Sequence, residues 1–445
     1  MLNLLFFQMK LVSKTIIAIA ISIWALDANA QLSLTGQYIP RVELRHGFKT
    51  LTSPSQGAAL FVSHRARLIM GYTQSKYKFN ISVQDVRTWG SQSQLNLSDN
   101  LFSIHEIWAE IFLKEKISLK LGRQELVYDD HRIFGNVDWT MQGRSHDIAL
   151  FKYSGDEMKL HLGLGFNQDS EQLFTTVYTN PNNYKTLQFL WMNNKFSEQL
   201  NASFLVLNNG LQFTFVDQAG NTKYDTKFSQ TIGGRVVSSG QLVGFSGAFY
   251  FQIGKDGNNQ DVSAYNLLAD VSYKVTDQLT LTAGVELLSG TSQTDLTNTK
   301  NNSFNPFYGT NHKFNGFMDY YFVANHINNV GLQDIFIKLG YKKDKHTASI
   351  VTHLFSSNDN ILNSTELAVT GNSVARDSSL GTEIDFTYVF VPSPDIAMQF
   401  GYSQMFATSS LVELKGGSKS EISNWVYLML KITPDFLKKV EDKEN

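Results

Sequence analysis

The sequence predicts an all-β protein: a transmembrane antiparallel β-barrel of about 18 strands, with short periplasmic turns and long extracellular loops. Three observations indicate this fold class. The N-terminus has the form of an export signal, apolar and polar residues alternate through most of the remaining chain, and the connections between the alternating segments are short and long in turn. Together they favour one large barrel over several soluble domains in a chain of 445 residues.

Composition excludes several other classes of protein. The chain is 42% apolar, 18% charged and 13% aromatic, and it contains no Cys, so disulfide scaffolds and cysteine metal sites are excluded. Its formal net charge of −2 provides no basic field for nucleic-acid binding. We therefore expect no nucleic-acid partner.

The first 30 residues predict a signal peptide that is cleaved after export. Lys10 and Lys14 precede the apolar run 15–26, and Ala28 and Ala30 offer the small residues that a signal peptidase reads. The run is too short for a transmembrane helix, which needs about 20 residues. A translation start at Met9 would give a signal of more ordinary length.

The rest of the chain contains no apolar stretch long enough for a membrane helix. The mature chain is therefore either soluble and exported or a barrel in the outer membrane of a Gram-negative bacterium. We expect residues 31–433 to form the barrel, in contact with outer-membrane lipid, and residues 434–445 to form a polar C-terminal tail.

Barrel strands are expected to show about 10 residues of alternation between lipid-facing and lumen-facing side chains. In residues 279–287 the odd positions are Leu, Leu, Ala, Val and Leu, whereas the even positions are Thr, Thr, Gly and Glu. Helical spacing does not fit this pattern. Such segments begin near Leu32, Leu60, Tyr77, Ile104, Ser118, Ser145, Met158, Leu187, Leu200, Phe228, Val243, Tyr265, Leu279, Leu332, Thr347, Leu380, Ile396 and Asn424.

The connections sort into two kinds. The short ones are residues 74–76, 114–116, 154–157, 193–198, 238–240, 276–278, 342–345 and 392–395. Longer segments rich in Asn, Gly, Ser and Thr lie between them, and the longest runs from Gly290 to Val330. Short periplasmic turns alternating with long external loops are typical of outer-membrane barrels. Aromatic residues beside the turns, such as Tyr72 and Tyr77, fit an interfacial girdle.

Charged residues are predicted to line the lumen. If the apolar residues face lipid, the alternation points Arg41, Glu43 and Arg45 inward from the first strand, and Arg65 and Arg67 inward from the second. Guanidinium groups bind carboxylates in a two-pronged geometry and remain charged at working pH. The alternative is that these charges only neutralise one another. Further candidates are Asp85, Arg87, Glu106, Glu110, Arg123 and Glu125, of which Asp85 and Arg87 reach the lumen only if a bulge interrupts the third strand near Gln84.

Catalytic hypotheses receive little support. Residues 145–147, Ser-His-Asp, contain the residue types of a hydrolase triad, but consecutive strand residues point to opposite faces. Residues 129–131, Asp-Asp-His, could hold a divalent ion, although such clusters are more often only solvated. A barrel-anchored enzyme that pairs a serine with a histidine across adjacent strands remains an alternative, with His64, His105 or His353 as its base. We expect no enzymatic activity, no metal centre and no cofactor.

Two segments resemble the alginate-export porin family of outer-membrane barrels. Residues 121–147 read LGRQELVYDDHRIFGNVDWTMQGRSHD, and residues 305–316 read NPFYGTNHKFNG before Asp319. Residues 381–385, GTEID, and residues 41–45, RVELR, also fit. In the first segment the matching positions are Gly122-Arg123-Gln124, Asp130-His131-Arg132 with Ile133, and Trp139 with Arg144-Ser145 and Asp147.

The resemblance implies an 18-stranded barrel whose electropositive, arginine-lined constriction passes a polyuronate outward. The cations implied by this similarity are Arg41, Arg65, Arg67, Arg87, Arg123, Arg132 and Arg144, and their implied partners are Glu43, Asp85, Glu125 and Asp147. The chain departs from the pattern in two respects. Its net charge is close to zero, and the polar tail continues where many barrels end on an aromatic residue.

These observations predict a passive outer-membrane pore for an anionic polysaccharide or oligosaccharide, such as an alginate-like polyuronate. Arginines would attract its carboxylates, and neighbouring acidic residues would keep the binding weak enough for conduction. The alternatives are a general porin for small solutes and a barrel-anchored enzyme or adhesin. The sequence leaves open the polymer, the direction of transport, the oligomeric state and whether periplasmic transport partners take part.

Overall fold

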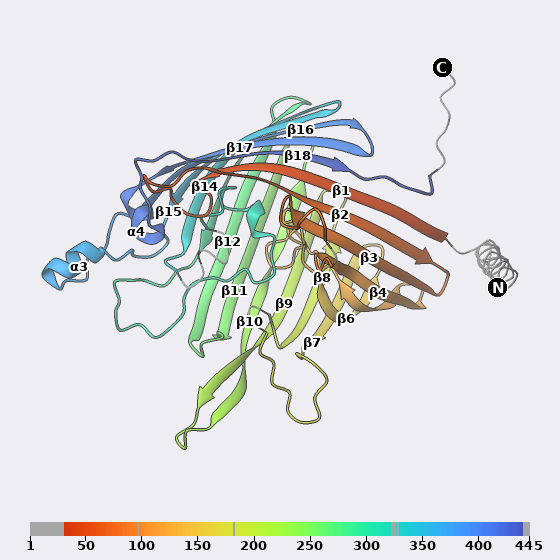
Figure 1. The fold of residues 1–445 in the computed structure, drawn as a ribbon, viewed down its shortest axis with the longest axis horizontal. Helices are drawn as coiled ribbons and strands as arrows, with labels where there is room; N and C mark the ends of the chain where they lie inside the picture. The colour runs from red at the N-terminus through yellow and green to blue at the C-terminus, as the bar shows by residue number, and fades with distance from the viewer. Residues whose placement is uncertain (1–30, 97, 181–182, 322–325, 327–328, 439–445) are drawn as a thin grey trace, which may run out of the picture.

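The computed structural model describes residues 31–438, except for residues 97, 181–182, 322–325 and 327–328. The predicted signal peptide, residues 1–30, and the end of the predicted tail, residues 439–445, lie outside the described residues. The described residues form one antiparallel sheet of 18 strands, which closes into a barrel because β1 pairs with both β2 and β18 (Figure 1). The predicted fold class is confirmed.

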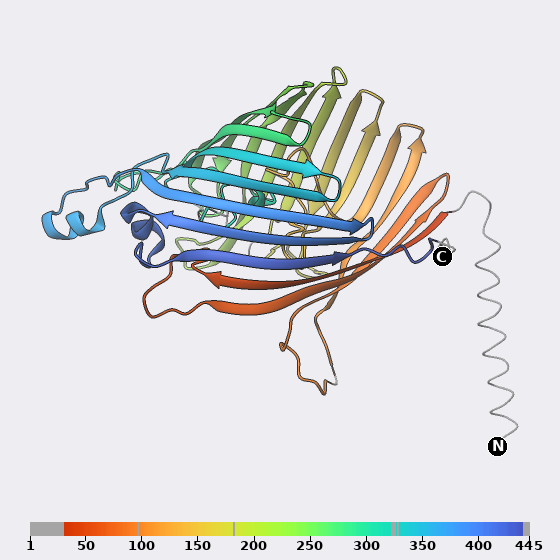
Figure 2. The ribbon, with the colours of Figure 1, turned by 90° about the horizontal axis from the view of Figure 1, so that it is seen from above.

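The strands follow one another around the barrel in chain order (Figure 2). They are β1 (Gln31–His46), β2 (Ala59–Thr73), β3 (Tyr77–Thr88), β4 (Phe102–Lys114), β5 (Ile117–Gln124), β6 (His146–Ser154), β7 (Met158–Phe166), β8 (Thr186–Lys195), β9 (Leu200–Val216), β10 (Thr222–Ser239), β11 (Val243–Lys255), β12 (Asp261–Lys274), β13 (Leu279–Leu288), β14 (Leu332–Lys343), β15 (His346–Ser356), β16 (Ser379–Ser393), β17 (Ile396–Ala407) and β18 (Ser423–Ile432). The short helices are η1 (Asn311–Lys313), α3 (Ser364–Thr370) and α4 (Ser409–Lys415). No helix among the described residues is long and apolar enough to cross a membrane.

Short turns join the strands at the end where β1 begins and β18 finishes, whereas α3 and α4 lie at the other end (Figure 1). Two connections at the α3 end, residues 217–221 and 256–260, are also short. The sequence predicted longer loops there because the polar starts of β10 and β12 do not carry a clear alternation. β10 begins at Thr222, not near Phe228, and its hairpin with β9 projects beyond the neighbouring strands (Figure 1).

The barrel wall has the predicted two faces. In β1, Val42 is 40% exposed, whereas Arg41 and Glu43 on either side of it are 5% and 1% exposed. Apolar residues also alternate outward in β2, where Leu68 and Met70 are exposed. An outer apolar surface of this kind suits a lipid environment, and the inner face carries the polar groups.

Two loops fold into the barrel and occupy much of its interior. Loop L3 (residues 125–145) and the described residues of loop L7 (residues 289–331) contribute buried apolar residues that pack against the inward faces of the strands. The loops also pair with each other, since the backbone N–H of Thr310 donates to the oxygen of His131 at 2.9 Å. Glycine permits this approach: a Cβ at Gly309 would collide with the backbone of Arg132.

Candidate pore-lining site

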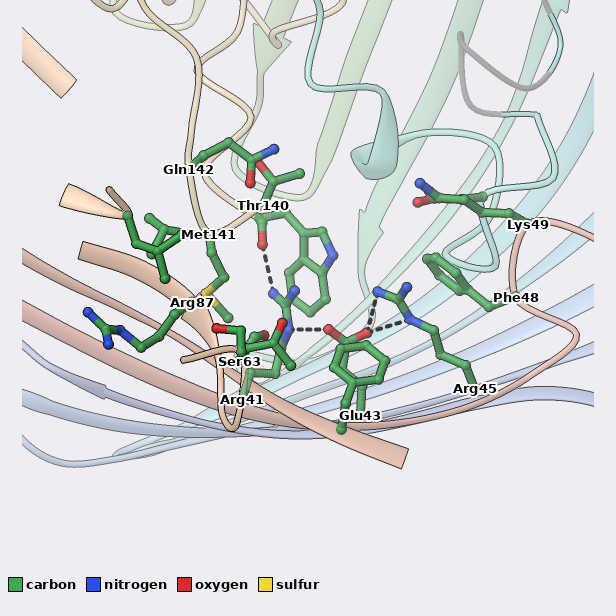
Figure 3. Close-up of a pocket in the computed structure, with 17 residues that line it drawn as sticks. Arg41, Glu43, Arg45, Phe48, Lys49, Ser63, Arg87, Thr140, Met141 and Gln142 are labelled. Carbon is green, nitrogen blue, oxygen red and sulfur yellow. Dashed lines mark hydrogen bonds and ion pairs between the residues drawn. The ribbon is translucent and has the colours of Figure 1, made fainter. Parts of the chain in front are cut away.

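The first strand presents a cluster of charge to a cavity between the barrel wall and L3 (Figure 3). Glu43 accepts a hydrogen bond from Nε of Arg41 and another from Nε of Arg45, each at 2.9 Å. Glu43 also accepts from the indole of Trp425 at 3.0 Å, so its buried carboxylate is well satisfied. The cavity has a volume of about 470 Å³.

The arginines of this cluster differ in what they can offer to a solute. Arg41 donates to the backbone oxygen of Trp139 in L3 at 2.7 Å, and its guanidinium lies 4.1 Å from the centroid of that indole ring. Arg45 instead lies over Phe48 and Phe61, at 4.3 and 4.7 Å from the ring centroids. The side chain of Arg45 is 34% exposed, compared with 5% for Arg41, so Arg45 is the more accessible cation.

The second strand uses its arginines to hold L3. Arg65 pairs with Asp138 at 2.7 Å and donates to the backbone oxygen of Met141 at 3.3 Å. Burial would raise the pKa of Asp138, but the charge and hydrogen bond of Arg65, together with the charges of Lys431 and Arg67, lower that pKa overall. Arg67 binds Gln84 through two donors, and its guanidinium lies 3.8 Å from Glu125. Both arginines face the interior, as predicted, but they are engaged by the protein itself.

The two ends of L3 are tied together on β4. Nε2 of His105 lies 2.7 Å from Oε1 of Glu125 at the start of L3, and Nδ1 of His105 lies 3.3 Å from Oγ of Ser145 at its end. Glu125 also accepts from Asn136 at 2.8 Å, and Glu106 accepts from the backbone N–H of Glu125 at 3.0 Å. The predicted candidates Glu106 and Glu125 therefore lie inside the barrel, at the base of this loop.

Arg132 fastens the middle of L3 to another part of the wall. It forms an ion pair with Glu286 on β13 and donates to the side-chain oxygen of Asn315 in L7 at 3.2 Å. Its guanidinium lies 3.8 Å from the ring centroid of Phe314. Both charged partners are only 3% exposed. Because L3 contacts β1, β2 and β13, the loop crosses the lumen.

Asp85 and Arg87 do not face the lumen. The register between β2 and β3 continues without interruption from Ser63 to Thr73, so no bulge reverses the faces of β3 at this point. Asp85 consequently projects from the outer face, where its carboxylate lies 3.2 Å from the ring of His64. The side chain of Arg87 pairs with both Asp85 and Asp99 on that face, although Arg87 also borders the cavity beside β1 (Figure 3). The irregularity lies in the pairing of β3 with β4 instead.

Arg123 and Asp147 also lie on the outer side of the wall. They are opposite each other in the register of β5 with β6 and pair at 2.9 Å, whereas their neighbours Gln124 and His146 are buried on the inner side. His146 and Asp147 therefore diverge, as the argument against a Ser-His-Asp triad required. Glu110, by contrast, faces the interior from β4 and accepts from a serine of β5 and a lysine of β6.

Arg144, the last of the predicted cations, lies near the end of L3 and donates to the backbone oxygen of Gly309 in L7 at 3.1 Å. In the neighbouring acidic stretch, Asp129 accepts from Trp191 and Asp130 pairs with Arg235 at 3.3 Å. The carboxylates of Asp129 and Asp130 therefore bind different partners and do not converge on one point. No group of three or more His, Asp or Glu among the described residues is arranged to hold a metal ion.

The sequence analysis quoted residues 381–385, GTEID, but did not list an acidic region on the inner faces of β13, β14 and β16 among the pore-lining candidates. The members of this region are Glu286, Asp334, Glu383 and Asp385. All four contact L7. Glu383 accepts from the backbone N–H of Met318 at 2.7 Å, and Asp385 accepts from that of Phe317 at 3.2 Å. Glu286 and Asp334 accept from the side chain of Asn315 at 2.9 and 3.2 Å. The alternation of these residues with lipid-facing residues such as Ile384 could have predicted that they face the lumen.

A closed 18-stranded antiparallel barrel with an apolar outer face and charged inner face defines an outer-membrane β-barrel of the porin type. Within that class the chain belongs to the alginate export family, because the family model described as "Alginate export" matches residues 30–421. No curated protein matches the chain.

Several solved outer-membrane proteins share the fold. Acinetobacter baumannii OccAB4 is 12% identical with a TM-score of 0.60, over 92% of this chain and 100% of that one. Pseudomonas aeruginosa OccK3 (OpdO) is 12% identical with a TM-score of 0.59, over 91% and 96% of the two chains. Pseudomonas aeruginosa OpdQ is 13% identical with a TM-score of 0.55, over 92% and 98%. At this level of identity the likeness concerns the fold.

Proposed function

We propose that the protein is an outer-membrane pore that passes an anionic polysaccharide or oligosaccharide, such as an alginate-like polyuronate. The observation that carries this proposal is the cavity of about 470 Å³ beside β1, where Arg45 remains exposed. Membership of the alginate export family supports a polysaccharide as the cargo. Residues 1–30 would direct export, and residues 31–433 would form the pore.

The chemistry around Arg45 suits weak binding of a sugar acid. Its guanidinium can donate to a carboxylate, and Phe48 and Phe61 beside it provide apolar faces of the kind found in small-molecule sites. Glu43 already holds Arg45 at 2.8 Å and offsets part of its charge. A polymer would therefore be attracted without being trapped, which conduction requires.

Substitution of Arg45 tests this proposal. Residues 31–445 would be refolded and inserted in a planar bilayer, and block of the single-channel current by a polyuronate would be measured for wild type and Arg45→Gln. We expect the polyuronate to block the variant about two- to fivefold more weakly than wild type, since one exposed ion pair contributes about 0.5–1 kcal/mol.

The matched control is Arg376→Gln, which removes an arginine from an external loop where it pairs with Glu413 at 2.5 Å. The polyuronate should block this control variant as strongly as it blocks wild type. Equal block by both variants and wild type would argue for a general porin that does not recognise carboxylates. Arg65 and Arg67 are less suitable targets, because their loss would also release L3.

One observation favours a second candidate, a serine hydrolase built on the barrel. Ser145, His105 and Glu125 form a chain of contacts of the kind used in catalytic triads, at 3.3 and 2.7 Å. However, His105 is only 4% exposed, and Glu125 is shared with Asn136. These features favour a structural tie between the ends of L3.

Ester hydrolysis separates the two roles of Ser145. We expect refolded wild type and Ser145→Ala to hydrolyse p-nitrophenyl acetate at the same background rate. A wild-type rate well above background that disappears in Ser145→Ala, with the barrel still folded, would establish the hydrolase instead.

A further inference from the structure

An apolar groove crosses the outer face of the barrel where β18, β1, β2, β3 and β4 lie side by side. Its volume is about 410 Å³. Small residues form its floor: Gly36 on β1 and Ala66 on β2 both point outward. Each of them is paired across the two strands with a large outward residue, Gly36 with Leu68 and Ala66 with Tyr38. The ring of Phe436 forms one wall of the groove, because it lies directly over Gly36.

The end of the groove nearest the long loops carries charged groups. Asp85 lies beside Ala66 in the register of β3 with β2 and lines the groove. Its carboxylate pairs with Arg87 and lies 3.2 Å from His64, and Arg87 also pairs with Asp99 at 2.7 Å. We call Asp85, Arg87, His64 and Asp99 the outer cluster. Both of its carboxylates are accessible, since the side chains of Asp85 and Asp99 are 22% and 31% exposed.

The outer cluster lies within the apolar belt of the wall. On β2, Val62 and Leu60 follow His64 toward the end with the long loops, and Leu60 is 69% exposed. On β4, Phe102 lies directly opposite Asp85 and is 61% exposed. Ionisable side chains are rare on a lipid-facing surface, where they are costly and often mark a functional site. The position of the cluster therefore indicates a membrane component as its partner.

The charge of the outer cluster selects the head group of a lipid. Asp85 and Asp99 provide two carboxylates against the single guanidinium of Arg87. With His64 neutral, the cluster has one negative charge in excess. An anionic head group is disfavoured there, whereas a protonated amine can donate hydrogen bonds to the carboxylates. Trp89 adds an aromatic face for a cation, because its indole N–H donates to His64 at 2.7 Å and the residue is 57% exposed.

The size of the groove suits the acyl part of a lipid. At about 30 Å³ for each water, 410 Å³ corresponds to about 14 waters, and a methylene group has a similar size. The groove therefore has room for most of one acyl chain. Its direction also fits, because Asp85 lies near the long-loop end of β3, whereas Phe436 contacts β1 nearer the short turns.

We propose that this groove binds one membrane lipid whose head group carries a positively charged amine. The amine binds the carboxylates of Asp85 and Asp99. One acyl chain lies over Gly36 and Ala66 and reaches Phe436. The site goes beyond the pore function and does not depend on the solute, since the groove lies on the outer side of the wall.

Native mass spectrometry of refolded residues 31–445 in detergent micelles tests the site. The probes are phosphatidylethanolamine, which carries the amine, and phosphatidylglycerol with the same acyl chains, which is anionic. We expect one phosphatidylethanolamine to bind about fivefold or more tightly than phosphatidylglycerol. Asp85→Asn should weaken phosphatidylethanolamine binding by about tenfold, because a charge-assisted hydrogen bond is lost. Ala66→Phe should weaken the binding of both lipids, because the added ring fills the groove.

Two matched variants serve as controls. Asp147→Asn removes another outer-face carboxylate that pairs with an arginine, and Ala283→Phe adds a ring to an outward position of β13. Both controls should bind phosphatidylethanolamine as wild type does.

Equal affinity of wild type for the two lipids would overturn the proposal, as would unchanged affinity in both Asp85→Asn and Ala66→Phe. If Asp85→Asn does not fold, Ala66→Phe still decides the matter, because full wild-type affinity with a filled groove contradicts the site. A dimer in the same spectra that disappears in Ala66→Phe would also contradict it, since the groove would then be covered by a second copy of the chain.

Discussion

At the scale of single residues, most of the arginines inside the barrel position a loop. Arg65 and Arg132 are nearly inaccessible to solvent. Arg65 of β2 binds Asp138 of L3, and Arg132 of L3 binds Glu286 of β13. Alternation correctly placed Arg41, Arg65 and Arg67 on the inner face, because that property depends only on strand geometry. It could not predict their contacts with L3, such as that of Arg65 with Asp138, since this loop is distant from β1 and β2 in sequence.

Loss of Arg132 should destabilise the protein strongly. Arg132→Gln would leave Glu286 buried without its cation, which costs about 3–5 kcal/mol when one member of a buried pair is removed. Urea unfolding of the refolded barrel, followed by tryptophan fluorescence, measures the change. The double variant Arg132→Gln/Glu286→Gln should recover part of the loss, and a single variant with wild-type stability would show that the pair does not anchor L3.

At the scale of elements, the strands could be predicted from the sequence, but the loops could not. The apolar outer face gives the strands a two-residue period, so the starts of short strands such as β5 were recognisable, whereas the polar starts of β10 and β12 were not. Asp85 and Arg87 were misplaced because a bulge was assumed where β3 continues regularly. The inward folding of L3 and L7 depends on contacts such as Thr310 with His131, and no periodic pattern reports such contacts.

The contact between L3 and L7 should depend on a glycine. In Gly309→Ala the new methyl group would collide with the backbone of Arg132 and push the loops apart, at a cost of about 1–3 kcal/mol. We expect a lower urea midpoint and more frequent fluctuations of the single-channel current. Gly57→Ala is the control, because no atom lies near its added Cβ. Identical behaviour of the two variants would contradict this role of Gly309.

At the scale of the whole molecule, a closed wall of 18 strands surrounds two loops that divide its interior. Because L3 and L7 lie inside the barrel, we expect their surfaces, as well as the wall, to contact a solute that passes through it. The C-terminal tail also takes part in the barrel: the backbone N–H of Phe436 donates to the oxygen of Leu34 at 2.9 Å. The first residues of the predicted tail therefore lie against β1, beyond the end of β18.

The central claim is that this barrel is a pore that recognises negatively charged polysaccharide. Single-channel current through wild-type residues 31–445 tests it directly, with a polyuronate and then a neutral polysaccharide of similar length added to one side of the bilayer. We predict a steady open current that the polyuronate interrupts at concentrations where the neutral polymer has little effect. Equal interruption by both polymers, or no current from a correctly folded barrel, would contradict the account.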